Sequence, residues 1–210
     1  RVEGNQDIYF TSISGDKVGK ISRLTTAAGP DIHPALAANK NGVWITWQGY
    51  REGSFDILYA NLEDPSKQTV VGKTSANEWE PSIATGSNGQ IAIAWDTYVK
   101  GNYDVYYALL DENGRVNKED HVAATLDFEA RPSLVFDNED RLWIAYELAG
   151  KNWGKDNGSH FFIDPEVETE GLFERGSLRV VCLDKGTFYT TGVPVHEVIP
   201  REKRYTFFYN

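Results

Sequence analysis

Glu80-Pro81-Ser82-Ile83-Ala84, followed seven residues later by Ile91-Ala92-Ile93-Ala94-Trp95, is one copy of a unit that recurs along the chain. The copy closes on Asp104-Val105-Tyr106-Tyr107. Pro34, Pro81 and Pro132 mark three successive copies, with spacings of 47 and 51 residues. An earlier Asp7-Ile8-Tyr9-Phe10 repeats the closing landmark alone. A period of this length, with several apolar runs in each copy, is typical of a repeat architecture.

Each copy predicts four short strands. The first is expected directly after the proline, because proline fixes the start of a strand where no donor is needed. Asn41-Gly42 and Asn88-Gly89 then indicate tight hairpin turns. The second strand is apolar on both faces, the third opens on a repeated Asp, and the fourth is polar like an edge strand. Four strands per period favour the blades of an all-β, antiparallel β-propeller.

The repeat divides the chain into blade-sized segments. We expect half a blade, three whole blades, the last with an insertion at 149–176, and the start of another. Their ranges are 1–26, 31–74, 78–124, 129–192 and 193–210. Propellers close with four to eight blades. About four blades are therefore expected either to form a small ring completed by the two ends of the chain or to be an incomplete part of a larger propeller, and we favour the incomplete part.

Composition excludes several classes of protein. A formal net charge of −10 disfavours nucleic acid as a partner, since phosphate binding needs a basic field. No stretch is long and apolar enough to cross a bilayer, which disfavours a membrane partner. The lone Cys182 lies in an apolar run and reads as a core thiol, and the four His residues have no metal-ligand spacing. We therefore expect neither a metal nor a cofactor.

The second and third units resemble a known family. The runs Glu80–Ala84, Ile93–Asp96 and Tyr103–Ala108, together with Trp47–Arg51 and Phe55–Ala60, are similar to the repeat of sialidase-like bacterial propellers. The resemblance covers roughly residues 1–148 and implies the propeller fold. It also implies an exported bacterial protein, so we expect a secreted or periplasmic location.

The resemblance does not extend to the catalytic set of sialidases. Their Ser-x-Asp-x-Gly-x-Thr-Trp pattern is absent from this sequence. Their three substrate-binding arginines also cannot be assigned from the four candidates in the repeats, which are Arg23, Arg51, Arg131 and Arg141. The sequence therefore resembles the fold family and not its chemistry.

In a propeller, the connections before the first strand and after the second lie on one face around the axis, where ligands commonly bind. The residues directly before the prolines, His33, Glu80 and Arg131, occupy one repeated position on this face and differ in every copy. A purely structural position should prefer one residue type. Two explanations stay open: contact with a ligand, or mutual ion pairing around a solvated ring.

The loops after the second strands add further candidates with polar or aromatic side chains. Such groups suit sugar recognition through ring stacking and paired hydrogen bonds. Trp153 could stack on a sugar or pack on its own insertion. The full set of ligand-binding candidates is His33, Gln48, Arg51, Glu80, Asp96, Lys100, Arg131, Glu147 and Trp153.

Two acidic positions are uniform among the repeats and therefore read as structural. Asp31, Glu78 and Glu129 precede each proline by three residues, and we expect them to accept hydrogen bonds from backbone or a neighbouring blade. The landmark residues Asp7, Asp56 and Asp104 are expected to accept from local backbone amides.

Three functions remain open. We favour a non-catalytic or accessory module that binds a carbohydrate or another small polar ligand on the loop face. The alternatives are a glycosidase-like hydrolase, with Glu80, Asp96 and Glu147 as weak catalytic candidates, and a scaffold that binds proteins. The remainder of its own propeller or another domain is a further candidate partner.

Overall fold

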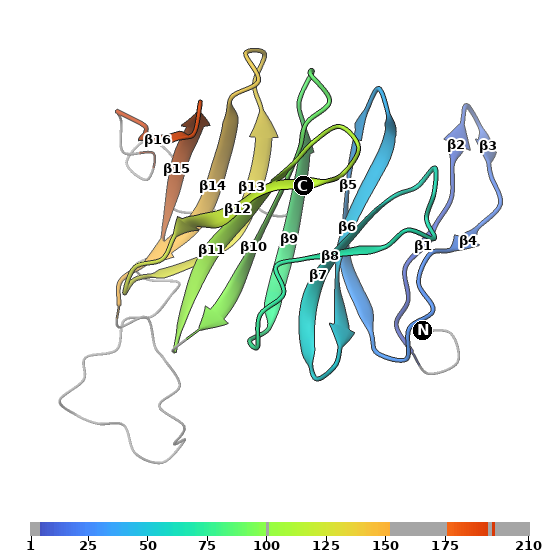
Figure 1. The fold of residues 1–210 in the computed structure, drawn as a ribbon, viewed down its shortest axis with the longest axis horizontal. Coiled ribbons are helices and arrows are strands. Elements are labelled where there is room, and N and C mark those ends of the chain that lie inside the picture. Colours follow the sequence, from blue (N-terminus) through green and yellow to red (C-terminus); the bar gives the residue numbers. More distant parts are fainter. Residues whose placement is uncertain (1–4, 100, 152–175, 193–194, 196–210) are drawn as a thin grey trace.

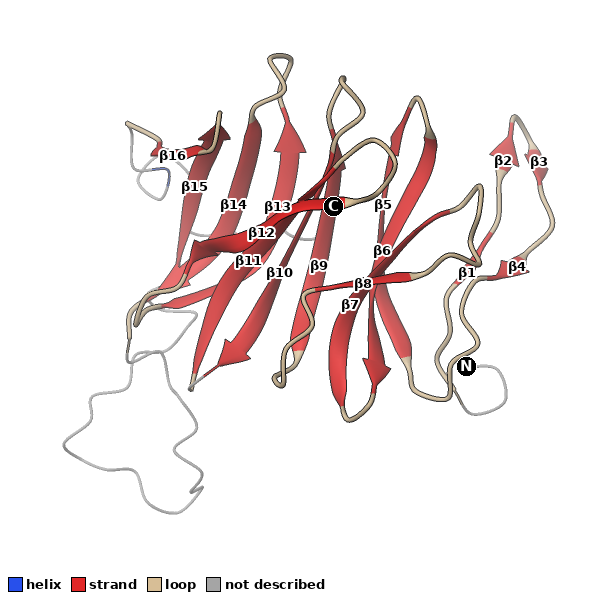
Figure 2. Ribbon diagram, in the orientation of Figure 1, coloured by secondary structure: helices blue, strands red, loops and turns tan. Residues whose placement is uncertain are grey.

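The computed structural model describes residues 5–99, 101–151, 176–192 and 195. These residues form an all-β structure of antiparallel sheets that stand side by side in chain order (Figures 1 and 2). Three of the sheets have four strands each, in the order first to fourth along the chain. The prediction of consecutive four-stranded antiparallel blades is confirmed. The described residues contain no helix long and apolar enough to span a membrane.

The strands of the three sheets are as follows. The first sheet has β5 (Asp31–Asn39), β6 (Gly42–Arg51), β7 (Ser54–Asn61) and β8 (Thr69–Val71). The second has β9 (Glu78–Thr85), β10 (Ile91–Val99), β11 (Asn102–Leu110) and β12 (Val116–Ala123). The third has β13 (Phe128–Phe136), β14 (Leu142–Ala149), β15 (Ser177–Asp184) and β16 (Thr187–Thr190).

The N-terminal part contributes two short pairs of strands. β1 (Tyr9–Phe10) pairs with β4 (Ser22–Arg23), and the hairpin of β2 (Ile13–Ser14) and β3 (Lys17–Val18) lies between them in the chain. Ile8 and Leu24 pack with Trp47 of the first sheet. This segment therefore supplies two separate two-stranded sheets, whereas each of the other units supplies one four-stranded sheet.

Apolar side chains fill the spaces between adjacent sheets. Trp44 and Tyr59 of the first sheet pack in one cluster with Ile93 and Trp95 of the second. On the opposite face of the second sheet, Tyr107 and its neighbours pack with residues of the third sheet. The second strands of the first two sheets are buried on both faces because these sheets are covered on both sides, as the composition of the strands predicts.

The beginning of each first strand differs from the expectation. β5, β9 and β13 begin before the proline, and the ladder to the next strand shifts register at the pre-proline and proline residues. The strands were expected to start after the proline because proline cannot donate to a ladder. A β-bulge solves this problem, since the bulged residues are left out of the pairing.

Candidate ligand-binding site between the second and third sheets

The pre-proline residues share an unusual backbone conformation. His33, Glu80 and Arg131 have φ values of 53°, 50° and 54°. Residues with a Cβ pay a steric cost in this left-handed region. The conformation recurs because each of these residues belongs to the β-bulge before the proline, so its strain is part of the repeated architecture.

Side chains from the preceding sheet hold two of these bulges in place. The backbone N–H of Glu80 donates to Gln48 Oε1 at 3.3 Å, and that of Arg131 donates to Asp96 Oδ2 at 2.7 Å. Gln48 and Asp96 occupy equivalent places at the end of the second strand, and Glu147 is their counterpart in the third sheet. Each bond joins one sheet to the next beside the loop face.

A cavity of about 310 Å³ lies where these elements of the second and third sheets meet. It brings together three of the predicted ligand-binding residues, Glu80, Asp96 and Arg131. The other lining residues are mainly aromatic, and the complete lining is Trp79, Glu80, Asp96, Tyr103, Phe128, Ala130 and Arg131. We refer to this space as the junction cavity.

Aromatic rings form one wall of the junction cavity. The Trp79 and Tyr103 ring centroids are 5.6 Å apart, and Phe128 meets Tyr103 edge-on at 5.3 Å. Tyr98 also contacts Tyr103, at 4.9 Å. The rings fix one another, so the half-buried Trp79 and Tyr103 present a preformed apolar surface.

Asp96 is the buried polar group of the cavity, with an exposed fraction of only 2%. Burial raises the pKa of Asp96 to about 7, because the charged form loses its hydration. The hydrogen bond from the Arg131 backbone opposes this rise, while the negative charges of Glu80 and Glu147 add to it. A carboxyl group with a pKa near 7 exchanges a proton around neutral pH.

The other charged groups of the rim are paired with each other. His33 Nδ1 lies 3.5 Å from Glu80 Oε1, and Arg131 Nη1 lies 2.6 Å from Glu147 Oε2. The side chains of Glu80 and Arg131 nevertheless remain about half exposed, at 45% and 50%. Both explanations of this repeated position therefore find support, since the side chains are ion-paired and remain accessible from the cavity.

The remaining predicted site residues lie elsewhere. Arg51 is drawn to the buried Asp31, with Nη2 at 2.7 Å from Oδ1, and does not line the junction cavity. Gln48 is buried and supports the Glu80 bulge. Lys100 and Trp153 lie outside the described residues.

At the acidic position three residues before each proline, two of the three residues have the predicted partners. Glu78 and Glu129 accept hydrogen bonds from the backbone N–H and hydroxyl of Thr74 and Thr125, as predicted for local structural acceptors. Asp31 differs, since Trp47 Nε1 and Arg51 donate to it. No group of three or more His, Cys, Asp or Glu side chains that could hold a metal is found in the described parts of the chain.

The landmark residues Asp7 and Asp56 have side-chain partners where backbone partners were predicted. Asp7 pairs with Arg23 at 2.8 Å, Ser54 Oγ donates to Asp56 at 3.5 Å, and Asn102 Nδ2 approaches Asp104 at the same distance. These side-chain contacts leave one oxygen each of Asp7 and Asp56 buried without a hydrogen-bond partner among the described residues.

The aromatic wall was missed in the sequence. Trp79 is equivalent to Ile32 in the first sheet and Ala130 in the third. The rule that singled out the pre-proline residues, variation at a repeated position on the loop face, applies equally to Trp79. Extending that rule by one residue would have found it.

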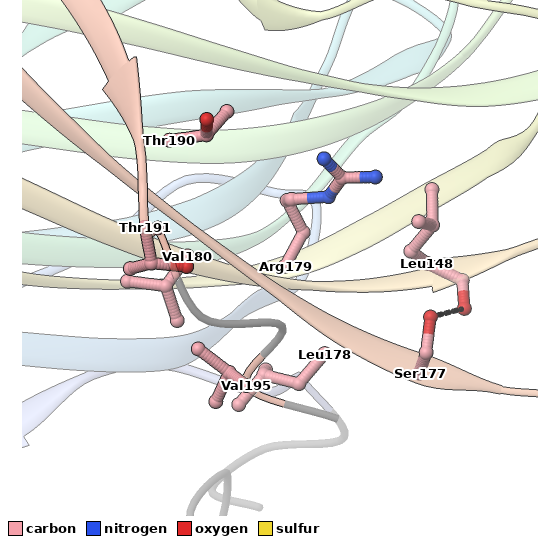
Figure 3. Close-up of a pocket in the computed structure, with 9 residues that line it drawn as sticks. Leu148, Ser177, Leu178, Arg179, Val180, Thr190, Thr191 and Val195 are labelled. Atoms are coloured by element: carbon pink, nitrogen blue, oxygen red, sulfur yellow. Dashed lines mark hydrogen bonds between the residues drawn. The ribbon is translucent and has the colours of Figure 1, made fainter. Parts of the chain in front are cut away.

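Two other cavities lack these features. One of about 310 Å³ lies against β15 and β16, where Arg179 is the only charged residue among the described residues of the lining and Ser177 Oγ donates to the Leu148 carbonyl (Figure 3). Another, of about 340 Å³, lies beside Trp44 and the turn at Gly114. Neither contains a predicted site residue, so the junction cavity is the better candidate.

No protein-family model matches the chain, and no curated protein matches it in sequence. Solved structures do match. A polysaccharide lyase bound to -[GlcA(1-4)Rha3S]-, an ulvan lyase, aligns over 89% of this chain and 50% of its own with 12% identity and a TM-score of 0.53. A Hadza microbial sialidase aligns over 83% and 43% with 9% identity and a TM-score of 0.52.

A Trypanosoma rangeli sialidase in complex with sialic acid is also similar, with 7% identity, coverage of 89% of this chain and 33% of its own, and a TM-score of 0.51. At these identities the likeness concerns the fold alone. The chain has the propeller fold of carbohydrate-active enzymes. It spans half or less of the length of these proteins.

Proposed function

We propose that this segment is a propeller module that binds a carbohydrate in the junction cavity. The observation that carries the proposal is the Trp79–Tyr103 wall beside Asp96, Glu80 and Arg131 in a single space of about 310 Å³. A sugar offers apolar C–H faces to aromatic rings and hydroxyl groups to charged hydrogen-bonding partners. Polar groups of this kind, few and convergent beside an apolar wall, are typical of small-molecule sites.

The structural neighbours support the choice of carbohydrate, because two of them are complexes with sugars. Three probes therefore suit the test: sialic acid, the disaccharide GlcA(1-4)Rha3S and neutral L-rhamnose. Saturation-transfer NMR on the folded chain should give a signal with at least one of them. No signal from any probe, nor from a wider array of acidic and neutral oligosaccharides, contradicts the proposal.

Trp79→Ala tests the location of the site. Loss of the stacking surface should weaken binding by about fivefold, because a favourable aromatic contact contributes roughly one kcal/mol. Tyr189→Ala is the matched control, since Tyr189 is an exposed aromatic residue on β16 and does not line the cavity. Equal effects of the two substitutions place the sugar elsewhere.

Hydrolysis of a glycosidic bond in the same cavity is the second candidate function. It is favoured by the pKa of Asp96 near 7, since a general acid must hold its proton at the working pH. Glu80 and Glu147, the carboxylates that would assist, are each engaged in an ion pair. Release of reducing sugar from the disaccharide probe, abolished by Asp96→Asn, would select hydrolysis over binding alone.

A further inference from the structure

Gln48 and Asp96 perform the same structural task with different chemistry. Each accepts the backbone N–H of the following pre-proline residue through one side-chain oxygen. The second arm of Gln48 is an amide NH₂, which donates hydrogen bonds. An ionised Asp96 would have only acceptors, whereas a protonated Asp96 reproduces the pattern of Gln48, with one acceptor oxygen and one donor.

The surroundings of Asp96 favour the protonated pattern. Its carboxyl group is buried, and the groups that face it are Glu80 from β9, Tyr103 from β11, and Arg131 and Glu147 from the third sheet. The Arg131 guanidinium is already engaged by Glu147 at 2.6 Å. Ionisation would therefore place a third carboxylate charge beside two existing ones, with the nearby cation largely neutralised.

We propose that Asp96 is a neutral carboxylic acid in the ligand-free cavity, and that its O–H group donates a hydrogen bond to an acceptor oxygen of the bound sugar. This inference rests on the proposed function and narrows it. The sugar must present a ring oxygen, an acyl carbonyl or a carboxylate toward Asp96. Binding then weakens as the pH rises past neutrality, because the ionised group offers the sugar an acceptor and a negative charge.

The protonation of Asp96 is measurable without any sugar. With aspartate labelled by ¹³C at the carboxyl carbon, the resonance that disappears in Asp96→Asn belongs to this residue. Its shift should titrate with a midpoint near pH 7. A midpoint at about 4, the value of an ordinary aspartate, overturns the inference whatever the sugar does.

The second measurement is the affinity of the three sugar probes at pH 5.5 and pH 8.5. We expect about tenfold weaker binding at pH 8.5, which corresponds to the loss of one hydrogen bond. Asp96→Asn should remove the dependence, so that the ratio of the two affinities is close to one. Glu78→Gln is the matched control, because Glu78 is a second buried carboxyl group that does not line the cavity.

The outcomes separate the two proposals. Failure of every probe to bind at either pH contradicts the proposed function and the proposed hydrogen bond from Asp96 to the sugar. The ¹³C titration still decides whether Asp96 is protonated in the free protein. Binding that is equally tight at both pH values overturns the inference and leaves the proposed function standing. The inference is also overturned if Glu78→Gln removes the difference in affinity between pH 5.5 and pH 8.5, since the pH dependence then arises outside the cavity.

Discussion

Asp96 Oδ2 accepts the backbone N–H of Arg131 at 2.7 Å, and this one bond ties the second sheet to the third at the point where the junction cavity opens. The acceptor is almost completely buried, and the donor belongs to a bulged residue that lies outside its own strand ladder. The same contact therefore supports the architecture and fixes two residues of the candidate site.

Removal of this acceptor should be costly. Asp96→Ala leaves the N–H of Arg131 without its partner, and we expect the free energy of unfolding to fall by about 1–3 kcal/mol. Asp96→Asn retains a carbonyl oxygen and should lose less. Urea denaturation of the two variants measures the difference, and equal losses would show that the bond does not stabilise the junction.

The left-handed backbone conformation of Glu80 predicts that glycine at this position is more stable than alanine, although neither residue can replace the carboxylate in sugar binding. Glu80→Gly should be about 0.5–1 kcal/mol more stable than Glu80→Ala, because glycine avoids the steric strain at φ 50° and this gain exceeds its greater loss of chain entropy. Both variants lose the carboxylate and should bind sugar less well. A glycine variant no more stable than the alanine variant contradicts the assigned strain.

Stability should depend on pH through Glu78. Burial raises the pKa of Glu78 to about 7, with the hydrogen bond from Thr74 opposing the rise and the charge of Asp56 adding to it. In the unfolded chain this group titrates near 4.3. Between these values the folded state holds a proton that the unfolded state releases, so the stabilisation is complete below about pH 4.3 and is lost as the pH rises through 7.

The corresponding experiment compares urea denaturation at pH 5 and pH 8. We expect the parent protein to lose about 1–3 kcal/mol between them from this group. Asp96 contributes with the same sign, because its pKa is also raised. Glu78→Gln should show a distinctly smaller loss, and an unchanged loss in that variant would exclude Glu78 as the source.

Close packing between the first and second sheets gives another test. Gly114 has φ +79°, and a Cβ there would lie 2.5 Å from the Trp44 ring. Gly114→Ala should cost about 2–4 kcal/mol, from backbone strain and the clash together. Gly186 has a similar φ of +83° with open space around it, so Gly186→Ala should cost only the strain, about 1–2 kcal/mol. Thermal denaturation of both variants isolates the clash.

The sheets could be predicted from the sequence because the regular spacing of the repeated landmarks indicates where each group of four strands begins and ends. The bulges could not be predicted from the sequence. Proline has no N–H for the strand ladder, and this can be accommodated either by starting the strand after the proline or by leaving the proline unpaired in a bulge. The grouping of Glu80, Asp96 and Arg131 followed from their repeated positions. Trp79 was missed because the prediction considered only the pre-proline residue, although the residue before it also varies between copies, as Ile32, Trp79 and Ala130.

The pre-proline residue is followed by a proline and lies outside the ladder in all three sheets, and in the second and third sheets a side chain of the preceding sheet accepts its N–H. Histidine, glutamate and arginine occupy it in turn without altering the sheets. One backbone conformation thus accepts side chains of different charge at the same place in successive sheets, so the chemistry presented near the loops can change without a change in the backbone.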